Sequence, residues 1–190
     1  MEINRTFYRL PTQRAFDEWK RAAPEGFLYS LKGSRAVTHF KRLLPGAKSL
    51  NLLLGRSQGL GEHREPVLWQ LPGTFKRDPP RLQNFLRTLD GHIRHAIEFR
   101  DPSWIDEEVF EILRRRGVAN VALSSEKMPR CLEVTADFVL RPVPRVRRRS
   151  GSRLHRPRFA ALGKISAGLR PPRSDRVCLL QQRYEHSRAF

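Results

Sequence analysis

The sequence predicts an α/β fold in which parallel strands alternate with outer helices. In the segment 66–104, two apolar runs flank a helix-like stretch, and a proline follows each run within two residues. This strand, helix, strand order is typical of a parallel β/α unit. Similar runs recur along the chain and give strand candidates at residues 2–7, 27–31, 67–71, 96–100, 118–123 and 136–140.

Polar residues near the ends of two runs indicate how the strands are arranged. Gln70 lies near the end of one run, and Glu98 and Arg100 lie near the end of the next, where a buried strand would normally be apolar. Because α/β proteins place their sites at strand carboxyl ends, polar residues there favour a β/α barrel. The alternative is an open doubly wound sheet, but no glycine-rich phosphate loop follows the first strand.

The first two helices of the alternation have recognisable signals. Thr12 can cap a helix that ends before Pro24. A loop containing Thr38 and His39 follows the second strand, and a leucine-rich helix is expected around residues 50–54.

Two later helices are predicted from their starts and their apolar spacing. One begins at Asp78 or the prolines after it and buries a face that includes Phe85. The other begins near Ser103, which stands three residues before Asp106 as in a capping box. The arginines 114–116 fall at the end of this helix, where cations favour the dipole, so a solvated helix end is preferred to a phosphate site.

Length and composition bound the class of protein. The 190 residues suffice for one domain, whereas a complete eight-stranded β/α barrel typically needs about 250. Cys131 and Cys178 form no metal-ligand spacing with the histidines and are expected to be reduced, as in a cytoplasmic protein. No apolar stretch has membrane-spanning length, and the amino terminus does not resemble a signal peptide. We therefore expect no membrane partner.

The net charge of +18 is distributed unevenly. Residues 141–190 hold 14 Lys and Arg against 2 Asp and Glu, so most of the excess lies in this Arg/Pro-rich tail. The tail has no regular hydrophobic period and is expected to be disordered. The alternative is that the tail binds nucleic acid nonspecifically through contacts with phosphates. We thus divide the chain into a barrel domain, residues 1–140, and a tail, residues 141–190.

The charged residues at the strand ends are the main site candidates. Glu98 and Arg100 are two apart on a strand and share a face, so Glu98 can act as a general acid or base while Arg100 binds an anion. The structural alternative is a salt-bridge network that joins them to Lys32 or Glu2. Lys32 can also bind an anion itself.

Four further residues have both a functional and a structural interpretation. Gln70 and Asn4 can orient a ligand by hydrogen bonds or satisfy groups within the barrel. His39 fits a surface or hydrogen-bonding role better than a catalytic one, and Trp104 fits packing beneath its loop better than stacking on a substrate. The carboxylates and histidines match no metal-ligand spacing, and no cofactor is predicted.

The segments EINRTFYRLP, FLYSLKGSRAVTH, VLWQLP and IEFRDPSW resemble, in order and spacing, the YecE-like family, domain of unknown function 72. The resemblance runs from Met1 to about Leu140 and implies an incomplete TIM-type barrel with a pocket at the strand carboxyl ends. It implies no reaction, because the family's activity is not established. The residues on its motifs are Glu2, Asn4, Phe7, Tyr8, Lys32, Thr38, His39, Gln70, Pro72, Glu98, Arg100, Pro102 and Trp104.

Two departures from the family pattern suggest that the chain is truncated. Family members begin with a further strand bearing a Gly-Thr-Ser-Gly-Trp-like motif, and they end in Arg-x-His-Gly and Tyr-Phe-Asn-Asn-Asp motifs that are missing here. In a shifted frame, residues 140–145 can encode Tyr-Val-Arg-Phe-His-Gly and residues 179–183 can encode Tyr-Phe-Asn-Asn-Asp. We therefore hypothesise that the chain is out of frame after about Val139, which also leaves a non-functional gene remnant as an alternative.

These expectations combine into one functional prediction. The first and last strands of a barrel are neighbours, so losing both leaves two unpaired sheet edges that favour self-association. For intact relatives we expect a small anionic ligand to be bound or transformed at the strand carboxyl ends.

Overall fold

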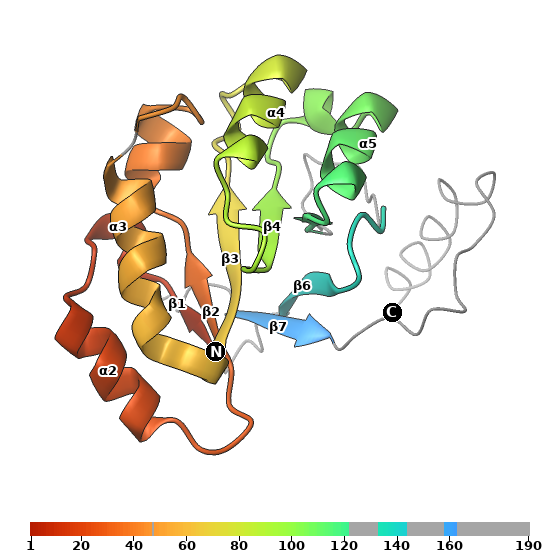
Figure 1. Ribbon diagram of the computed structural model, residues 1–190. Coiled ribbons are helices and arrows are strands. Elements are labelled where there is room, and N and C mark those ends of the chain that lie inside the picture. Colours follow the sequence, from red (N-terminus) through yellow and green to blue (C-terminus); the bar gives the residue numbers. More distant parts are fainter. Residues whose placement is uncertain (47, 122–132, 144–157, 163–190) are drawn as a thin grey trace, which may run out of the picture.

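The computed structural model describes residues 1–46, 48–121, 133–143 and 158–162, and its centre is a five-stranded sheet (Figure 1). All pairings within this sheet are parallel. The strand order follows the chain order. The strands are β1 (Glu2–Ile3), β2 (Tyr29–Lys32), β3 (Arg64–Gln70), β4 (His95–Glu98) and β5 (Ala119–Asn120).

Helices connect the strands and pack against one face of the sheet. A doubly wound sheet reverses its strand order at a switch point, whereas successive neighbours with helices on one side are the arrangement of a β/α barrel. The predicted α/β class is therefore confirmed. The helices are α1 (Arg5–Tyr8), α2 (Gln13–Ala22), α3 (Lys48–Ser57), α4 (Pro79–Arg87) and α5 (Glu107–Arg115), with short turns η1 (Ala36–Phe40), η2 (Gln58–His63) and η3 (Pro102–Trp104).

Two predicted helix starts are confirmed and one is wrong. The Thr12 hydroxyl accepts a hydrogen bond from the Ala15 amide at 3.3 Å, and Asp78 caps α4 in the same way. Helix α5 is capped by Asp106 itself, not by Ser103. Ser103 lies within η3, and its hydroxyl instead accepts from the Arg77 amide at 2.9 Å.

The predicted strand 2–7 is wrong beyond Ile3. The chain turns into the short helix α1, and the Thr6 hydroxyl lies 2.8 Å from the Ile3 carbonyl oxygen and 2.6 Å from that of Lys32. This buried side chain holds the turn over the end of β2. The loop predicted around Thr38 is also wrong, because these residues form the helical turn η1.

The candidate strand at 136–140 does not join the parallel sheet. Strand β6 (Val139–Val143) pairs antiparallel with β7 (Arg158–Leu162) in a separate two-stranded sheet. These strands extend into the segment 141–190, for which we predicted disorder. The rest of that segment lies outside the described residues, as do Cys131 and Cys178.

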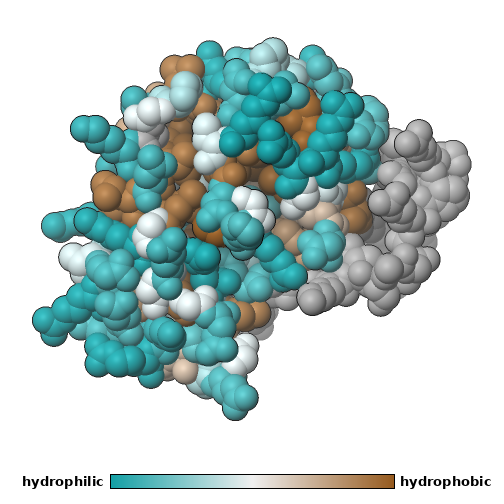
Figure 2. All heavy atoms as spheres, viewed as in Figure 1, coloured by the Kyte–Doolittle hydropathy of each residue, from teal (hydrophilic) through white to brown (hydrophobic). Residues whose placement is uncertain are grey.

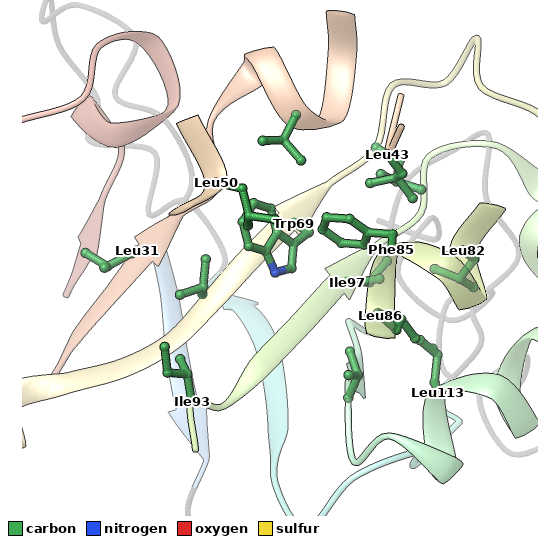
Figure 3. Close-up of a cluster of buried hydrophobic side chains, with 14 of the residues drawn as sticks. Leu31, Leu43, Leu50, Trp69, Leu82, Phe85, Leu86, Ile93, Ile97 and Leu113 are labelled. Atoms are coloured by element: carbon green, nitrogen blue, oxygen red, sulfur yellow. The ribbon is translucent and has the colours of Figure 1, made fainter. Parts of the chain in front are cut away.

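The core between the sheet and the helices is centred on Trp69 of β3 (Figure 3). The Trp69 and Phe85 rings meet edge to face, with centroids 5.3 Å apart. A Cβ atom at Gly33 would lie 2.2 Å from Trp69 Cε3, so only glycine allows the end of β2 to pass this ring. Leu31, Ile97 and Leu113 complete this part of the cluster.

The opposite face of the sheet has a smaller apolar cluster and a set of polar residues. Leu68 and Ala96 pack there against Phe138 and Leu140. Arg94, at the amino end of β4, lies over the Phe138 ring at 5.5 Å. The residues around β6 therefore pack against the amino-terminal part of this face. The polar residues lie nearer the carboxyl ends of the strands.

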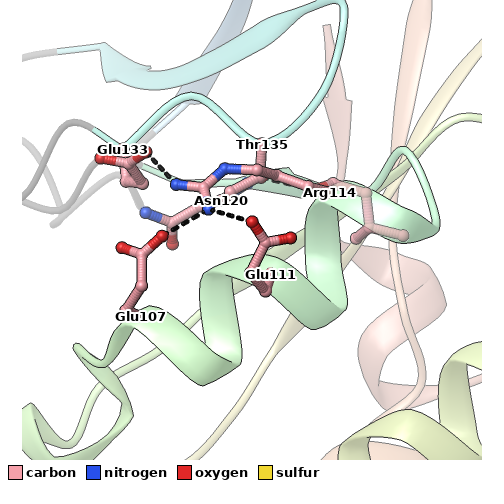
Figure 4. A network of polar contacts seen from close by, with 7 residues as sticks. Glu107, Glu111, Arg114, Asn120, Glu133 and Thr135 are labelled. Carbon is pink, nitrogen blue, oxygen red and sulfur yellow. Dashed lines mark hydrogen bonds and ion pairs between the residues drawn. The ribbon is translucent and has the colours of Figure 1, made fainter. Parts of the chain in front are cut away.

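Arg115 and Arg116 are exposed at the carboxyl end of α5, as predicted, whereas the Arg114 side chain is only 22% exposed. Its guanidinium bonds Glu107 at 2.7 Å and Glu111 at 3.3 Å, and it also pairs with the buried Glu133 (Figure 4). Burial lowers the pKa of Arg114, but the bonds to Glu107 and Glu133 outweigh this effect and raise it overall. The network fastens the segment that follows residue 132 to α5.

The segment that contains Thr135 also lies along the outer edge of β5. The Thr135 hydroxyl accepts from the Asn120 amide at 2.8 Å and donates to the Val118 carbonyl at 2.6 Å. Part of this sheet edge is thus already hydrogen-bonded. Self-association through the edges stays a prediction.

The outer face is mostly hydrophilic, with apolar patches over α3 (Figure 2). Leu44 and Leu52 are among its exposed apolar side chains. Among the described residues, no helix has the length and apolar character needed to cross a membrane.

Candidate functional site

The carboxyl ends of β2, β3 and β4 bring three predicted site residues to one face of the sheet. Gln70 pairs in register with Glu98, and Lys32 pairs with Leu68 two residues before Gln70. Side chains alternate along a strand, so Lys32, Gln70 and Glu98 project to the same side. This is the face away from the helices.

Glu98 is the buried anchor of the group. Gln70 Nε2 donates to Glu98 Oε2 at 2.7 Å, and Arg100 Nε donates to Glu98 Oε1 at 2.8 Å. The Glu98 side chain is 1% exposed, whereas that of Arg100 is 47% exposed. Both carboxylate oxygens therefore have donors, and Glu98 holds the Arg100 guanidinium at the border between the interior and solvent.

Lys32 is a buried cation without a close anion. Within the described part of the chain, no carboxylate lies within 4.0 Å of its ammonium, which instead sits 4.9 Å from the centre of the Phe7 ring. Burial lowers the pKa of Lys32, while attraction to Glu2 and Glu98 opposes this and Arg100 adds to it. Of the salt-bridge network that was the structural alternative, the described residues contain the Glu98–Arg100 pair but no ion pair of Lys32.

Glu2 and Asn4 lie at the end of β1 and also face this group. The Glu2 side chain is buried, yet neither of its oxygens has a hydrogen-bond partner among the described residues, and the same holds for Asn4 Oδ1. Burial raises the pKa of Glu2 to about 7, Lys32 opposes this and Glu98 adds to it. Asn4 is near enough to lower that pKa slightly, but the two side chains are not aligned as a hydrogen bond.

His39 lies beside the cations rather than on a remote surface loop. Its Nδ1 and the buried Thr38 hydroxyl are 2.8 Å apart, and its ring meets Phe7 edge to face at 5.0 Å. Burial lowers the pKa of His39, and Lys32, Arg100 and Arg35 lower it further. His39 is therefore a neutral hydrogen-bonding residue at the rim of the group.

Trp104 belongs to the core and not to the site. It is fully buried, its indole N–H donates to the Phe75 carbonyl at 2.6 Å, and its ring stacks on Phe99 at 4.9 Å. The packing interpretation made from the sequence therefore agrees with its position.

Arg35 is a rim residue that sequence reasoning missed. Its guanidinium lies 5.6 Å from the Tyr8 ring and 5.4 Å from the Phe40 ring, and both rings are exposed. The available signal was an arginine shortly after Lys32 with aromatic residues on either side of it in the sequence. Lys32, Arg100 and Arg35 are three cations near His39, and all three lower its pKa in addition to burial.

Two other features are not part of this site. The described residues contain no group of three or more His, Cys, Asp or Glu side chains that could hold a metal ion. A groove of about 300 Å³ lies between η1, α3 and α4 on the outer face, and Leu50 and Phe85 are among its lining residues.

The fold and site define an α/β protein with a barrel-type parallel sheet and a mixed-charge group at its strand carboxyl ends. The family described as "Protein of unknown function DUF72" matches residues 1–189, and the chain belongs to this family. The match continues beyond Leu140, where we had expected the resemblance to stop.

The UPF0759 protein YecE of Escherichia coli K12 is 28% identical over 131 residues, which are 66% of this chain and 48% of that protein. The YecE protein of Escherichia coli O157:H7 gives the same values. The chain thus spans about half the length of the curated relatives it matches.

Solved structures of DUF72 proteins share the fold. One from Thermotoga maritima has a TM-score of 0.61 and 26% identity, covering 72% of this chain and 56% of that one. One from Enterococcus faecalis has a TM-score of 0.59 and 18% identity, with the same coverage. DUF72 proteins have a TIM-like fold, so the predicted TIM-type architecture is confirmed.

Proposed function

We propose that this DUF72 protein binds a small anionic ligand at the carboxyl ends of its parallel strands. The observation that carries the proposal is the buried residue Lys32, whose ammonium has no ion pair within 4.0 Å among the described residues. A buried cation costs folding free energy unless it is paired. A bound anion would supply the missing partner.

Arg100 provides the second contact to the anion. Its Nε is bound to Glu98, so the guanidinium is held in place while its other N–H groups remain able to donate. A guanidinium is suited to bidentate binding of phosphate or carboxylate. Fixing it in advance reduces the entropy lost when a ligand binds.

The geometry favours a positioning role for Glu98 over the predicted catalytic one. Each of its two oxygens already accepts a hydrogen bond, one from Gln70 and one from Arg100, so the carboxylate is engaged in holding these two side chains. Gln70 likewise orients Glu98 and not the ligand directly. The ligand-binding roles then fall to Lys32 and Arg100, with Asn4 and Glu2 beside them.

Calorimetric titration of the full chain with inorganic phosphate, sulfate and acetate tests the proposal. We expect at least one of these anions to bind, and Arg100→Gln and Lys32→Met each to weaken its binding about tenfold or more. Arg14→Gln is the matched control, because Arg14 is exposed on α2 and pairs only with Glu18 among the described residues. Equal binding by wild type, Arg100→Gln and Lys32→Met would contradict the proposal.

The basic tail gives the competing test. Nonspecific binding to nucleic acid would fall steeply with salt and disappear when residues 141–190 are deleted. Binding of a small anion at the strand ends should persist when residues 141–190 are deleted and should weaken when Lys32 or Arg100 is replaced.

A further inference from the structure

The strand-end group contains three hydrogen-bond acceptors that the described part of the chain does not use. These are both carboxylate oxygens of Glu2 and the amide oxygen of Asn4. Each is buried, and Glu2 is only 7% exposed. Buried polar atoms in native proteins nearly always have partners, so unused acceptors in one place indicate a missing donor.

Among the described residues, none makes a hydrogen bond to these oxygens, although the side chain of Asn4 lies near enough to Glu2 to lower its pKa. Asn4 occupies the N-cap position of α1, but its side chain accepts no capping hydrogen bond. Arg100 donates through Nε to Glu98, and its remaining N–H groups make no hydrogen bond to Glu2 or to Asn4 Oδ1. The amino group of Met1 donates to the Leu28 carbonyl at 2.6 Å. Lys32 attracts Glu2 electrostatically but makes no ion pair within 4.0 Å with it.

The acceptors lie beside the cations proposed to bind the anion. Lys32 lowers the pKa of Glu2, while Glu98 and burial raise it, so Glu2, Lys32 and Glu98 form one electrostatic group. A ligand held by Lys32 and Arg100 therefore has Glu2 and Asn4 within the same small site. An anion that offered only further acceptors would leave these three oxygens unpaired and would add repulsion to Glu2.

We propose that Glu2 and Asn4 form an acceptor subsite, and that the ligand is an anion carrying hydroxyl or ammonium groups, such as a polyol phosphate or a hydroxy acid. This inference rests on the proposed function and specifies its ligand class. The anionic end of the ligand contacts Lys32 and Arg100, and its donor groups contact Glu2 and Asn4. Glu98 and Gln70 hold Arg100 and do not select between ligands.

Two phosphate monoesters of equal charge and similar size provide the test. Glycerol 3-phosphate has two hydroxyl donors, and n-propyl phosphate has none. At about pH 8, calorimetry on the full chain should show glycerol 3-phosphate binding about tenfold or more tightly, as one hydrogen bond to a charged acceptor predicts. The preference should shrink at about pH 5.5, because a protonated Glu2 is a weaker acceptor.

Variants separate the acceptor subsite from the anion contacts. Glu2→Gln should reduce the preference and remove its dependence on pH, whereas Arg100→Gln should weaken both esters by the same factor and leave the preference intact. The wild-type pH series carries the test even when a Glu2 variant fails to fold. The groups that face Glu2 and enter its titration are Lys32, Glu98 and the amino terminus of Met1.

The outcomes distinguish this inference from the proposed function. Equal binding of the two esters by wild type, with both weakened by Arg100→Gln, would overturn the acceptor subsite and keep the anion site. No binding of either ester, together with no binding of inorganic phosphate, sulfate or acetate, would overturn both. A preference that Glu2→Gln leaves unchanged at both pH values would also overturn the subsite.

Discussion

The two faces of the parallel sheet are built by opposite rules. The face against the helices holds apolar side chains such as Leu31, Trp69 and Ile97, and these are almost completely buried. The other face is apolar only near its amino-terminal end, and it carries Lys32 and Glu98 where the strands finish. Among the described strand residues, the buried charged side chains lie on the second face.

The difference separates stability from function. Burying apolar side chains contributes folding free energy, whereas burying charged ones costs it unless they are fully paired. Among the described residues, both oxygens of Glu98 accept hydrogen bonds, whereas Lys32 has no ion pair within 4.0 Å and neither oxygen of Glu2 has a hydrogen-bond partner. Buried charged residues that lower stability are typical of a binding or catalytic site. We therefore expect substitutions on the helix face to affect stability, and substitutions on the other face to affect ligand binding.

The largest effect on stability is expected from Trp69→Ala on the helix face. The side chain is fully buried against Phe85, and removing it leaves a large cavity. We expect unfolding free energy to fall by about 3–5 kcal/mol, measured by urea denaturation. Phe40→Ala is the control, since this ring is 70% exposed and its loss should change stability by less than about 0.5 kcal/mol.

The pH dependence of Glu2 tests the cost of a buried charge on the other face. Its pKa is raised from 4.5 to about 7, so between these values the folded protein keeps a proton that the unfolded chain releases. Stability from this group is thus highest at low pH and is lost as pH rises through 7. The unfolding free energy of wild type should therefore fall between about pH 5 and about pH 8, and that of Glu2→Gln should not fall for this reason. The difference between the two proteins should shift in favour of Glu2→Gln by roughly 2 to 3 kcal/mol over this range.

Urea denaturation at the two pH values measures this gain. Glu18→Gln, at a partly exposed position on α2, is the control for a general effect of removing one carboxylate. A Glu2→Gln variant whose stability runs parallel to that of wild type across this pH range would show that burial of Glu2 has no electrostatic cost.

A smaller loss is expected from Glu98→Ala. The change leaves the buried Gln70 amide without its partner and releases Arg100, whose side chain is about half exposed and can rehydrate. We expect unfolding free energy to fall by about 1–3 kcal/mol and anion binding to weaken because Arg100 is no longer held. Denaturation and calorimetry on the same samples measure the two effects. Unaltered stability would mean that the paired carboxylate is not a structural anchor.

The smallest effect on stability is expected from Lys32→Met. The change keeps the length of the side chain but removes a charge whose burial outweighs its attraction to nearby carboxylates. Thermal unfolding should place the stability of the variant within about 1 kcal/mol of wild type, or above it, although anion binding weakens about tenfold or more. A severe loss of stability would show that Lys32 has a structural role and would remove the contrast between the faces.

Local signals in the sequence were sufficient for much of the scaffold. The caps at Thr12 and Asp78 depend on a side chain and an amide three residues away, so the residue type alone predicts them. The central strands follow from continuous apolar runs, because a parallel strand buried on both faces has no polar alternation. These features depend on neighbours along the chain.

Features that depend on distant neighbours were predicted less well. The strand expected at 2–7 ends at Ile3, because Thr6 bonds to the end of β2 across 26 residues of chain. Residues 136–140 were predicted as another strand of the parallel sheet, but β6 begins at Val139 and pairs antiparallel with β7. Apolar content indicates a strand, and it does not specify the partner.

The candidate site shows the same division. The sequence by itself determined that Lys32, Gln70, Glu98 and Arg100 stand at strand ends, since alternation and strand length place them there. Only the tertiary structure decided that Glu98 has both oxygens paired while Glu2 has neither paired among the described residues. The reason is physical: hydrogen bonding and desolvation depend on atoms brought together from separate strands, and no spacing along one strand contains that information.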